Sequence, residues 1–188
     1  MTLRRHLLAE RARLPEGPEA TARRTALALL ACDGADTVAC FGSTGDEPDT
    51  WPLIDALAAR GMRVLLPVLG PRADGGRRQH PDWAWYAGPE SLRVGLWGIR
   101  EPTTPPLGAE VLAEAGFVWS SALAATPAGA RLGAGGGWYD RALAWAPPAA
   151  PIGVLVRDNE VLESVPLEPW DRPISLIVTE TRAIRCPE

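Results

Sequence analysis

Lysine is absent from this sequence of 188 residues, and all 19 basic residues are arginines. Without lysine the chain can form no Schiff base with a carbonyl substrate, and it cannot carry the lysine of a Walker A phosphate-binding loop. The arginine bias, alongside 19 glycines and 19 prolines, is also what a GC-rich genome produces. The absence of lysine therefore excludes two kinds of chemistry without pointing to a function.

Cysteine is scarce as well. The three thiols, Cys32, Cys40 and Cys186, are odd in number and share no C-x-x-C spacing. This argues against a disulfide framework and against a structural zinc site. We expect these cysteines to be packed residues or residues without a specific role.

Long hydrophobic runs and an excess of positive charge are also missing. The N-terminal segment is too charged for a signal peptide, and no later stretch reaches about 18 apolar residues. A net charge of −4 provides no basic field for holding nucleic acid, so any anion must be held by local groups. We expect a cytoplasmic monomer that binds small molecules, and neither nucleic acid nor membrane.

Length and composition indicate an ordinary globular protein. Hydrophobic residues make up 46% of the chain and charged residues 22%, close to the averages for soluble proteins. A chain of this length can bury a continuous core without disulfides or metal. We assign residues 1–188 to a single domain.

Apolar runs and breaker residues alternate in the order typical of an α/β protein. The pattern predicts buried strands at 37–41, 62–68, 82–86, 117–119, 152–156 and 174–178, and helices at 2–13, 19–31, 50–60 and 138–145. Strand, helix and strand across 37–68 predict a right-handed crossover of a parallel sheet. The predicted fold class is α/β, a single three-layer domain with a mainly parallel (mixed) central sheet and helices on both faces.

Some local features are predicted in more detail. In helix 19–31, Leu30 is expected to face the core and Arg24 to stay in solvent. Thr50 is predicted to cap the third helix, and Gly61 to end it.

Two segments contain too many glycines and prolines for a long regular element. Residues 69–81 are predicted to form a surface loop. Residues 88–106 are predicted to form an irregular loop that lines a site.

The most informative segment is 131–141, with the sequence Arg-Leu-Gly-Ala-Gly-Gly-Gly-Trp-Tyr-Asp-Arg. Its glycines permit positive φ and let the backbone present several N–H donors close to a phosphate. The helix that follows favours an anion at its start, and Arg131 can add a charged contact. Asp140 would repel a bare phosphate, so we predict Mg²⁺ between them. A plain tight loop stays open as an alternative, because the segment matches neither Walker A nor G-x-G-x-x-G.

Residues 131–140 resemble the R-L-G-x-G-x-G-Y-Y-D signature of the 5-formyltetrahydrofolate cyclo-ligase family, with Trp138 in place of the first tyrosine. Further segments resemble the family in the same order: Leu3-Arg4 with Arg11, residues 46–50, residues 98–102 and residues 166–171. The resemblance implies an α/β enzyme that uses ATP and Mg²⁺ to convert 5-formyltetrahydrofolate into 5,10-methenyltetrahydrofolate, with release of ADP and phosphate.

The resemblance also implies roles for individual residues. ATP is expected to contact Arg4 and the glycine-rich segment, which comprises Arg131, Leu132, Gly133, Ala134, Gly135, Gly136, Gly137, Trp138 and Tyr139. Thr44 and Asp49 are expected to contact the folate. Mg²⁺ is expected at Asp140 and Asp171, and the catalytic residues would be Arg131, Tyr139 and Asp140.

Structural alternatives exist for several of these residues. Asp49 is also typical of a helix N-terminus, Asp171 of a turn, and Arg4 of a solvated helix face. Some aromatic residues could stack on the pterin but are more typical of a core, namely Trp83, Trp85 and Trp97.

The chain departs from the family pattern at a few positions. No lysine precedes Leu3-Arg4, Ala134 stands where the family often has arginine or tyrosine, and Ser175 stands where it usually has aspartate. These departures leave open a catalytically weakened paralogue that binds folate or nucleotide without this turnover. A third possibility is an unrelated α/β domain that acts as an interaction module.

Overall fold

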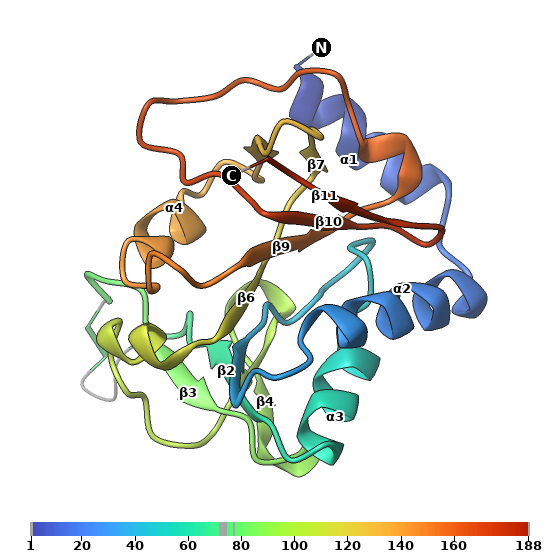
Figure 1. The fold of residues 1–188 in the computed structure, drawn as a ribbon. Coiled ribbons are helices and arrows are strands. Elements are labelled where there is room, and N and C mark those ends of the chain that lie inside the picture. Colours follow the sequence, from blue (N-terminus) through green and yellow to red (C-terminus); the bar gives the residue numbers. More distant parts are fainter. Residues whose placement is uncertain (1, 72–74, 77, 188) are drawn as a thin grey trace.

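A seven-stranded sheet forms the centre of the protein (Figure 1). The structure is a computed structural model that describes residues 2–71, 75–76 and 78–187. The strands of the sheet are β1 Thr37–Ala39, β2 Arg63–Pro67, β3 Trp83–Trp85, β6 Phe117–Ser120, β9 Ile152–Leu155, β10 Leu176–Val178 and β11 Ala183–Arg185. Their order in space is β11-β10-β9-β6-β1-β2-β3.

The inner strands of the sheet are parallel, and the edge strands β3 and β11 are antiparallel to their neighbours. Val38 of β1 pairs with Val64 of β2 on one side and with Phe117 of β6 on the other. All three residues are buried, as expected for parallel strands that are covered on both faces. The predicted α/β class with a mainly parallel, mixed sheet is confirmed, while β11 was not predicted.

The α-helices in the described part of the chain are α1 Leu3–Arg13, α2 Pro18–Ala31, α3 Trp51–Ala59 and α4 Trp138–Leu143. α2 and α3 pack against each other on one side of the sheet, and α4 lies on the opposite side (Figure 1). The four predicted helices are thus confirmed, with some ends moved by one or two residues. Among the described residues, no helix combines the length and the apolar character that crossing a membrane requires.

Short elements fill the connections. They are η1 Pro89–Ser91, β4 Leu92–Val94, η2 Leu96–Gly98, β5 Arg100–Pro102, η3 Glu110–Glu114, β7 Ala124–Ala125, β8 Arg131–Leu132 and η4 Asp158–Glu160. β4 pairs with β5 and β7 with β8, both antiparallel. Part of the predicted loop 69–81, namely 72–74 and 77, lies outside the described residues.

The segment 88–106 is more regular than predicted, because it contains the β4–β5 hairpin. Glu101 on β5 is only 1% exposed and accepts hydrogen bonds from the amides of Leu69 and Gly70, at 2.8 Å and 2.9 Å. A Cβ atom added at Gly95 would lie 2.7 Å from Cδ of Glu101. The glycine that argued against a strand is therefore the residue that makes room for this carboxylate.

The prediction for the buried face of α2 was wrong. Leu30 is 65% exposed, whereas Arg24 is only 1% exposed. The Arg24 guanidinium donates to Glu16 Oε1 at 2.6 Å and to Glu180 Oε2 at 2.8 Å. Two carboxylates from other parts of the chain compensate the buried charge, and helical periodicity carries no information about them.

Gly153 in the middle of β9 provides the first prediction. A Cβ atom at this position would lie 2.5 Å from Cζ3 of the buried Trp119 and 3.0 Å from Cε1 of Phe117. Overpacking of this kind typically costs about 1–3 kcal/mol. We expect Gly153→Ala to lower the free energy of unfolding, measured by urea denaturation, by this amount. A change of a few tenths of a kcal/mol would mean that the Trp119 ring can move aside.

Candidate active site

Residues 133–137 form an exposed loop between β8 and α4, at the position of the predicted phosphate site. Gly135 and Gly137 have φ angles of 101° and 62°, in the region that favours glycine. In the parts of the chain that the structure describes, the amides of residues 134–137 donate no hydrogen bond. Backbone N–H groups that are not used by the protein are suited to binding an anion.

Side chains from three elements surround this loop. Arg4 reaches it from α1, and its Nε donates to the Gly133 carbonyl at 2.9 Å. Arg131, the first residue of β8, is 8% exposed and forms an ion pair with Asp140 on α4. Arg141 Nη1 donates to the Gly136 carbonyl at 3.4 Å. The structure therefore brings the predicted residues Arg4, Arg131 and Asp140 together, and it adds Arg141.

Tyr139 lies behind the loop, in the protein interior. It is 7% exposed, and its ring centroid lies 4.9 Å from that of Trp138 and 6.3 Å from that of Trp83. Its phenol oxygen is buried and has no hydrogen-bond partner among the described residues. Burial raises the pKa of this phenol well above its ordinary value, and the neighbouring Cys40 and Glu47 raise it further. The structure thus places Tyr139, a predicted ATP contact and catalytic residue, in the hydrophobic core.

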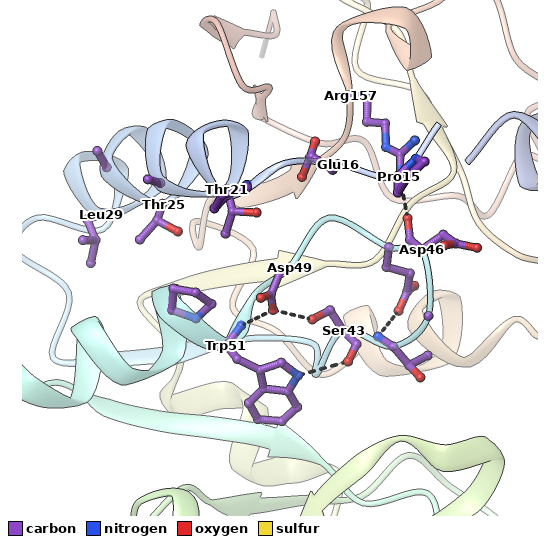
Figure 2. Close-up of a pocket in the computed structure, with 17 residues that line it drawn as sticks. Pro15, Glu16, Thr21, Thr25, Leu29, Ser43, Asp46, Asp49, Trp51 and Arg157 are labelled. Carbon is purple, nitrogen blue, oxygen red and sulfur yellow. Dashed lines mark hydrogen bonds between the residues drawn. The ribbon is translucent and has the colours of Figure 1, made fainter. Parts of the chain in front are cut away.

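A cavity of about 910 Å³ opens between α2 and the loop that follows β1 (Figure 2). Both predicted folate contacts, Thr44 and Asp49, line it. Figure 2 shows Thr21 and Leu29 along α2 on one side of the cavity and Asp49 with Trp51 on the other. An apolar wall with a few polar groups is typical of sites for small organic ligands.

The start of α3 shapes one wall of this cavity. Thr50 stands at the N-cap position, but its side chain does not cap the helix, contrary to the prediction. Its hydroxyl instead donates to the Phe41 carbonyl at 2.8 Å and accepts from the Ser43 amide at 3.0 Å. Asp49 accepts the Trp51 amide at 3.0 Å in its place. Asp49 thus lies at a helix N-terminus, which was the structural alternative to a role in folate binding. It also lines the cavity.

The second predicted metal ligand makes local contacts. Asp171 Oδ2 accepts the amide of Glu168 at 2.9 Å, which fits the turn alternative. In the described ranges, no group of three or more histidine, cysteine or carboxylate side chains could hold a metal ion. Mg²⁺ in phosphate sites needs only one or two carboxylates beside phosphate oxygens and water. Asp140, 33% exposed at the open phosphate loop, fits such a ligand set.

The three tryptophans considered for pterin stacking differ in environment. Trp83 is fully buried, as the core alternative proposed, and Trp85 is partly buried, with the Arg63 guanidinium 4.6 Å from its ring centroid. Trp97 is 77% exposed and has a φ of 56°, which is unusual for a residue other than glycine. It lines a second cavity of about 660 Å³ together with Trp138 and Arg141.

Comparison with known proteins assigns the chain to a family. The model of the 5-formyltetrahydrofolate cyclo-ligase family matches residues 1–180. The chain belongs to this family. The 5-formyltetrahydrofolate cyclo-ligase of Mycolicibacterium smegmatis is 40% identical over 186 residues, which cover 97% of this chain and 94% of the relative. The enzyme of the same name from Escherichia coli K12 is 35% identical over 153 residues, covering 79% and 80%.

Membership in the cyclo-ligase family makes this protein a ligase that forms a C–N bond. Its fold matches the solution structure of 5,10-methenyltetrahydrofolate synthetase from Aquifex aeolicus with a TM-score of 0.75. That match has 24% sequence identity and covers 99% of this chain and 92% of the other. At this identity the structural likeness supports the fold alone.

Sequence reasoning missed two residues, Glu47 and Arg157, that line the cavity of about 910 Å³. Glu47 lies within a segment that matches the family, yet nothing in its residue type pointed to a role. Arg157 lines the cavity just beyond β9, and its Nη2 donates to the Asp46 carbonyl at 3.0 Å. The rule that ligands bind beyond the carboxyl ends of parallel strands could have found Arg157.

Proposed function

We propose that this protein uses ATP and Mg²⁺ to close 5-formyltetrahydrofolate into 5,10-methenyltetrahydrofolate, with release of ADP and phosphate. The proposal rests on the convergence of Arg4, Arg131 and Asp140 on a glycine-rich loop in which the amides of residues 134–137 have no acceptor within the described part of the chain. Phosphoryl transfer depends mostly on positioning and on neutralising charge, and these groups supply both.

The chemistry follows from two steps on the folate. The formyl oxygen attacks the γ-phosphorus of ATP, the bond to the β,γ-bridging oxygen breaks, and ADP leaves with its electron pair. N10 then attacks the activated formyl carbon, so that phosphate leaves. Arg4, Arg131 and the amides of loop 133–137 hold the phosphate oxygens, while Tyr139 lies behind them in the interior. Mg²⁺, when held by Asp140 and Asp171, neutralises part of the phosphate charge. No covalent nucleophile on the protein is needed, which suits a chain without lysine.

The folate is expected in the cavity of about 910 Å³, against Thr44 and Asp49. We further propose that residues 1–188 form one domain that works as a cytoplasmic monomer on these small molecules, without nucleic acid or membrane partners. The net charge of −4 supports the absence of a nucleic-acid partner.

The direct test mixes the protein with 5-formyltetrahydrofolate, ATP and Mg²⁺ and follows the absorbance of methenyltetrahydrofolate. A rise that requires all four components is the expected result. Thermal stabilisation by folate or ATP without an absorbance change would instead identify a binding paralogue. Absence of both effects in folded protein would indicate an interaction module.

Gly135→Ala tests the phosphate loop. The φ of 101° forces an alanine at this position into a strained conformation, which costs about 1–2 kcal/mol or displaces the loop amides. We expect the affinity for ATP·Mg²⁺, measured by isothermal titration calorimetry, to fall about tenfold. Gly34→Ala is the matched control, because Gly34 has a φ of 86° in a distant exposed turn. Equal ATP affinity in both variants would contradict the phosphate-loop assignment.

A further inference from the structure

Glu47 is a carboxylate on the wall of the large cavity, beside the predicted folate contact Thr44. Its Oε2 accepts the Thr44 amide at 2.9 Å, which fixes the side chain in a partly buried position. Burial raises the pKa of this carboxyl above its ordinary value, while the hydrogen bond from Thr44 and the charge of Arg11 lower it in part. The side chain is therefore held at the cavity as a base stronger than an exposed glutamate.

Among the described residues, two buried polar atoms without a hydrogen-bond partner belong to side chains that interact electrostatically with Glu47. They are the phenol oxygen of Tyr139 and Nη1 of Arg11, in residues that are 7% and 2% exposed. The negative charge of Glu47 raises the pKa of the Tyr139 phenol, and the positive charge of Arg131 at the phosphate site lowers it. Glu47 thus lines the folate cavity by position, and its charge also raises the pKa of Tyr139 behind the glycine-rich loop.

Most other charged groups near the cavity are engaged elsewhere, except the carboxylate of Asp46, which is exposed to solvent. Glu16 is paired with the buried Arg24, and Asp49 accepts the amide of Trp51 at the start of α3. Asp46 is exposed, and its carbonyl accepts Arg157. Arg11 is committed to Glu160 in a buried ion pair. Within the described residues, Glu47 is in no ion pair, so its carboxylate remains available to the contents of the cavity.

We propose that Glu47 is the base that accepts the N10 proton as the folate ring closes, an inference that rests on the proposed function. The lone pair of N10 forms the new C–N bond to the activated formyl carbon. The N10–H bond breaks and its proton moves to the Glu47 carboxylate. The bond between the formyl carbon and the phosphate oxygen breaks, and its electron pair leaves with the phosphate. No further reactant is needed.

The experiment compares wild-type protein with Glu47→Gln from about pH 5 to about pH 8. Glutamine can still accept the Thr44 amide but cannot take up a proton. Wild-type kcat should fall as the pH drops through the raised pKa of Glu47, because the protonated carboxyl is no base. In Glu47→Gln we expect kcat to be about 100-fold lower and this acidic limb to disappear. The matched control is Glu19→Gln, which changes a side chain that is 89% exposed.

Two further measurements separate a base from a structural or binding residue. The dissociation constant for 5-formyltetrahydrofolate without ATP should stay within about twofold of the wild-type value in Glu47→Gln. A folded-state pKa above that of the unfolded chain means that the carboxyl stabilises the fold at low pH and loses this contribution as the pH rises. Glu47→Gln should therefore melt no lower than wild type at neutral pH.

The outcomes distinguish this inference from the function on which it rests. A rise in KM with unchanged kcat, or an acidic limb that persists in Glu47→Gln, would overturn the role of Glu47 and leave the proposed function intact. Should Glu47→Gln fail to fold, Glu47→Asp must show the acidic limb at reduced kcat, and an unchanged kcat there would equally overturn it. Absence of turnover in wild-type protein would contradict the proposed function and this inference with it.

Discussion

Replacing Asp140 with asparagine is expected to lower kcat for ring closure by about 10²–10³-fold. Asp140 is the carboxylate at the open side of the phosphate loop, and its ion pair with Arg131 holds both groups beside residues 133–137. Asparagine has nearly the same shape but brings no negative charge to Mg²⁺ and leaves Arg131 without its partner. The absorbance assay at saturating ATP and Mg²⁺ measures the effect.

Nucleotide binding shows whether the loss comes from the metal. In wild-type protein, Mg²⁺ should tighten the binding of ATP, because the proposed site would hold the cation between the Asp140 carboxylate and the phosphates. In Asp140→Asn this tightening should vanish, whereas ATP without metal should bind at least as well, since a like charge has been removed. The control is Asp33→Asn, which alters a 64% exposed carboxylate near Arg60. An Asp140→Asn variant that keeps its kcat would contradict the metal assignment.

The chemistry of the glycine-rich segment could be predicted from the sequence because it depends on neighbouring residues. The glycines that permit positive φ, Arg131 and Asp140 all fall within ten residues of chain, although the ion pair between Arg131 and Asp140 was not predicted. The inner strands could also be predicted from their apolar runs, because a strand that is buried on both faces needs apolar residues throughout. These local signals located both the sheet and the candidate phosphate site.

The features that escaped prediction depend on residues far apart in the chain. Arg24 is buried because Glu16 and Glu180 both reach it, and Glu180 lies 156 positions away. Glu101 organises the 88–106 hairpin by accepting amides about 30 positions earlier. The raised pKa of Glu47 results from burial, which only the fold reveals. Each of these polar groups is tolerated in the interior because of partners that periodicity cannot reveal.

The largest expected loss of stability comes from Arg11 on α1. Its guanidinium and the Glu160 carboxylate are each 2% exposed, and two hydrogen bonds of 2.6 Å and 2.8 Å join them. Arg11 also donates to the Ala122 carbonyl at 2.8 Å. The pair thus links the first helix to segments more than a hundred residues away. Arg11→Met fills similar space without charge and strands the Glu160 carboxylate in the interior.

We expect Arg11→Met to lower the free energy of unfolding by about 3–5 kcal/mol, measured by urea denaturation. Adding Glu160→Gln should recover much of this loss, because glutamine removes the stranded charge and can still accept the Arg157 amide, as Glu160 does at 2.8 Å. Arg13→Met on the same helix is the control, since Arg13 is 68% exposed and its pair with Glu10 contributes about 1 kcal/mol at most. Equal losses in Arg11→Met and Arg13→Met would mean that the buried pair does not hold α1 in place. If the double variant Arg11→Met/Glu160→Gln is no more stable than Arg11→Met, the unpaired carboxylate is not the cause of the loss. The loss would then come from the missing hydrogen bond to the Ala122 carbonyl.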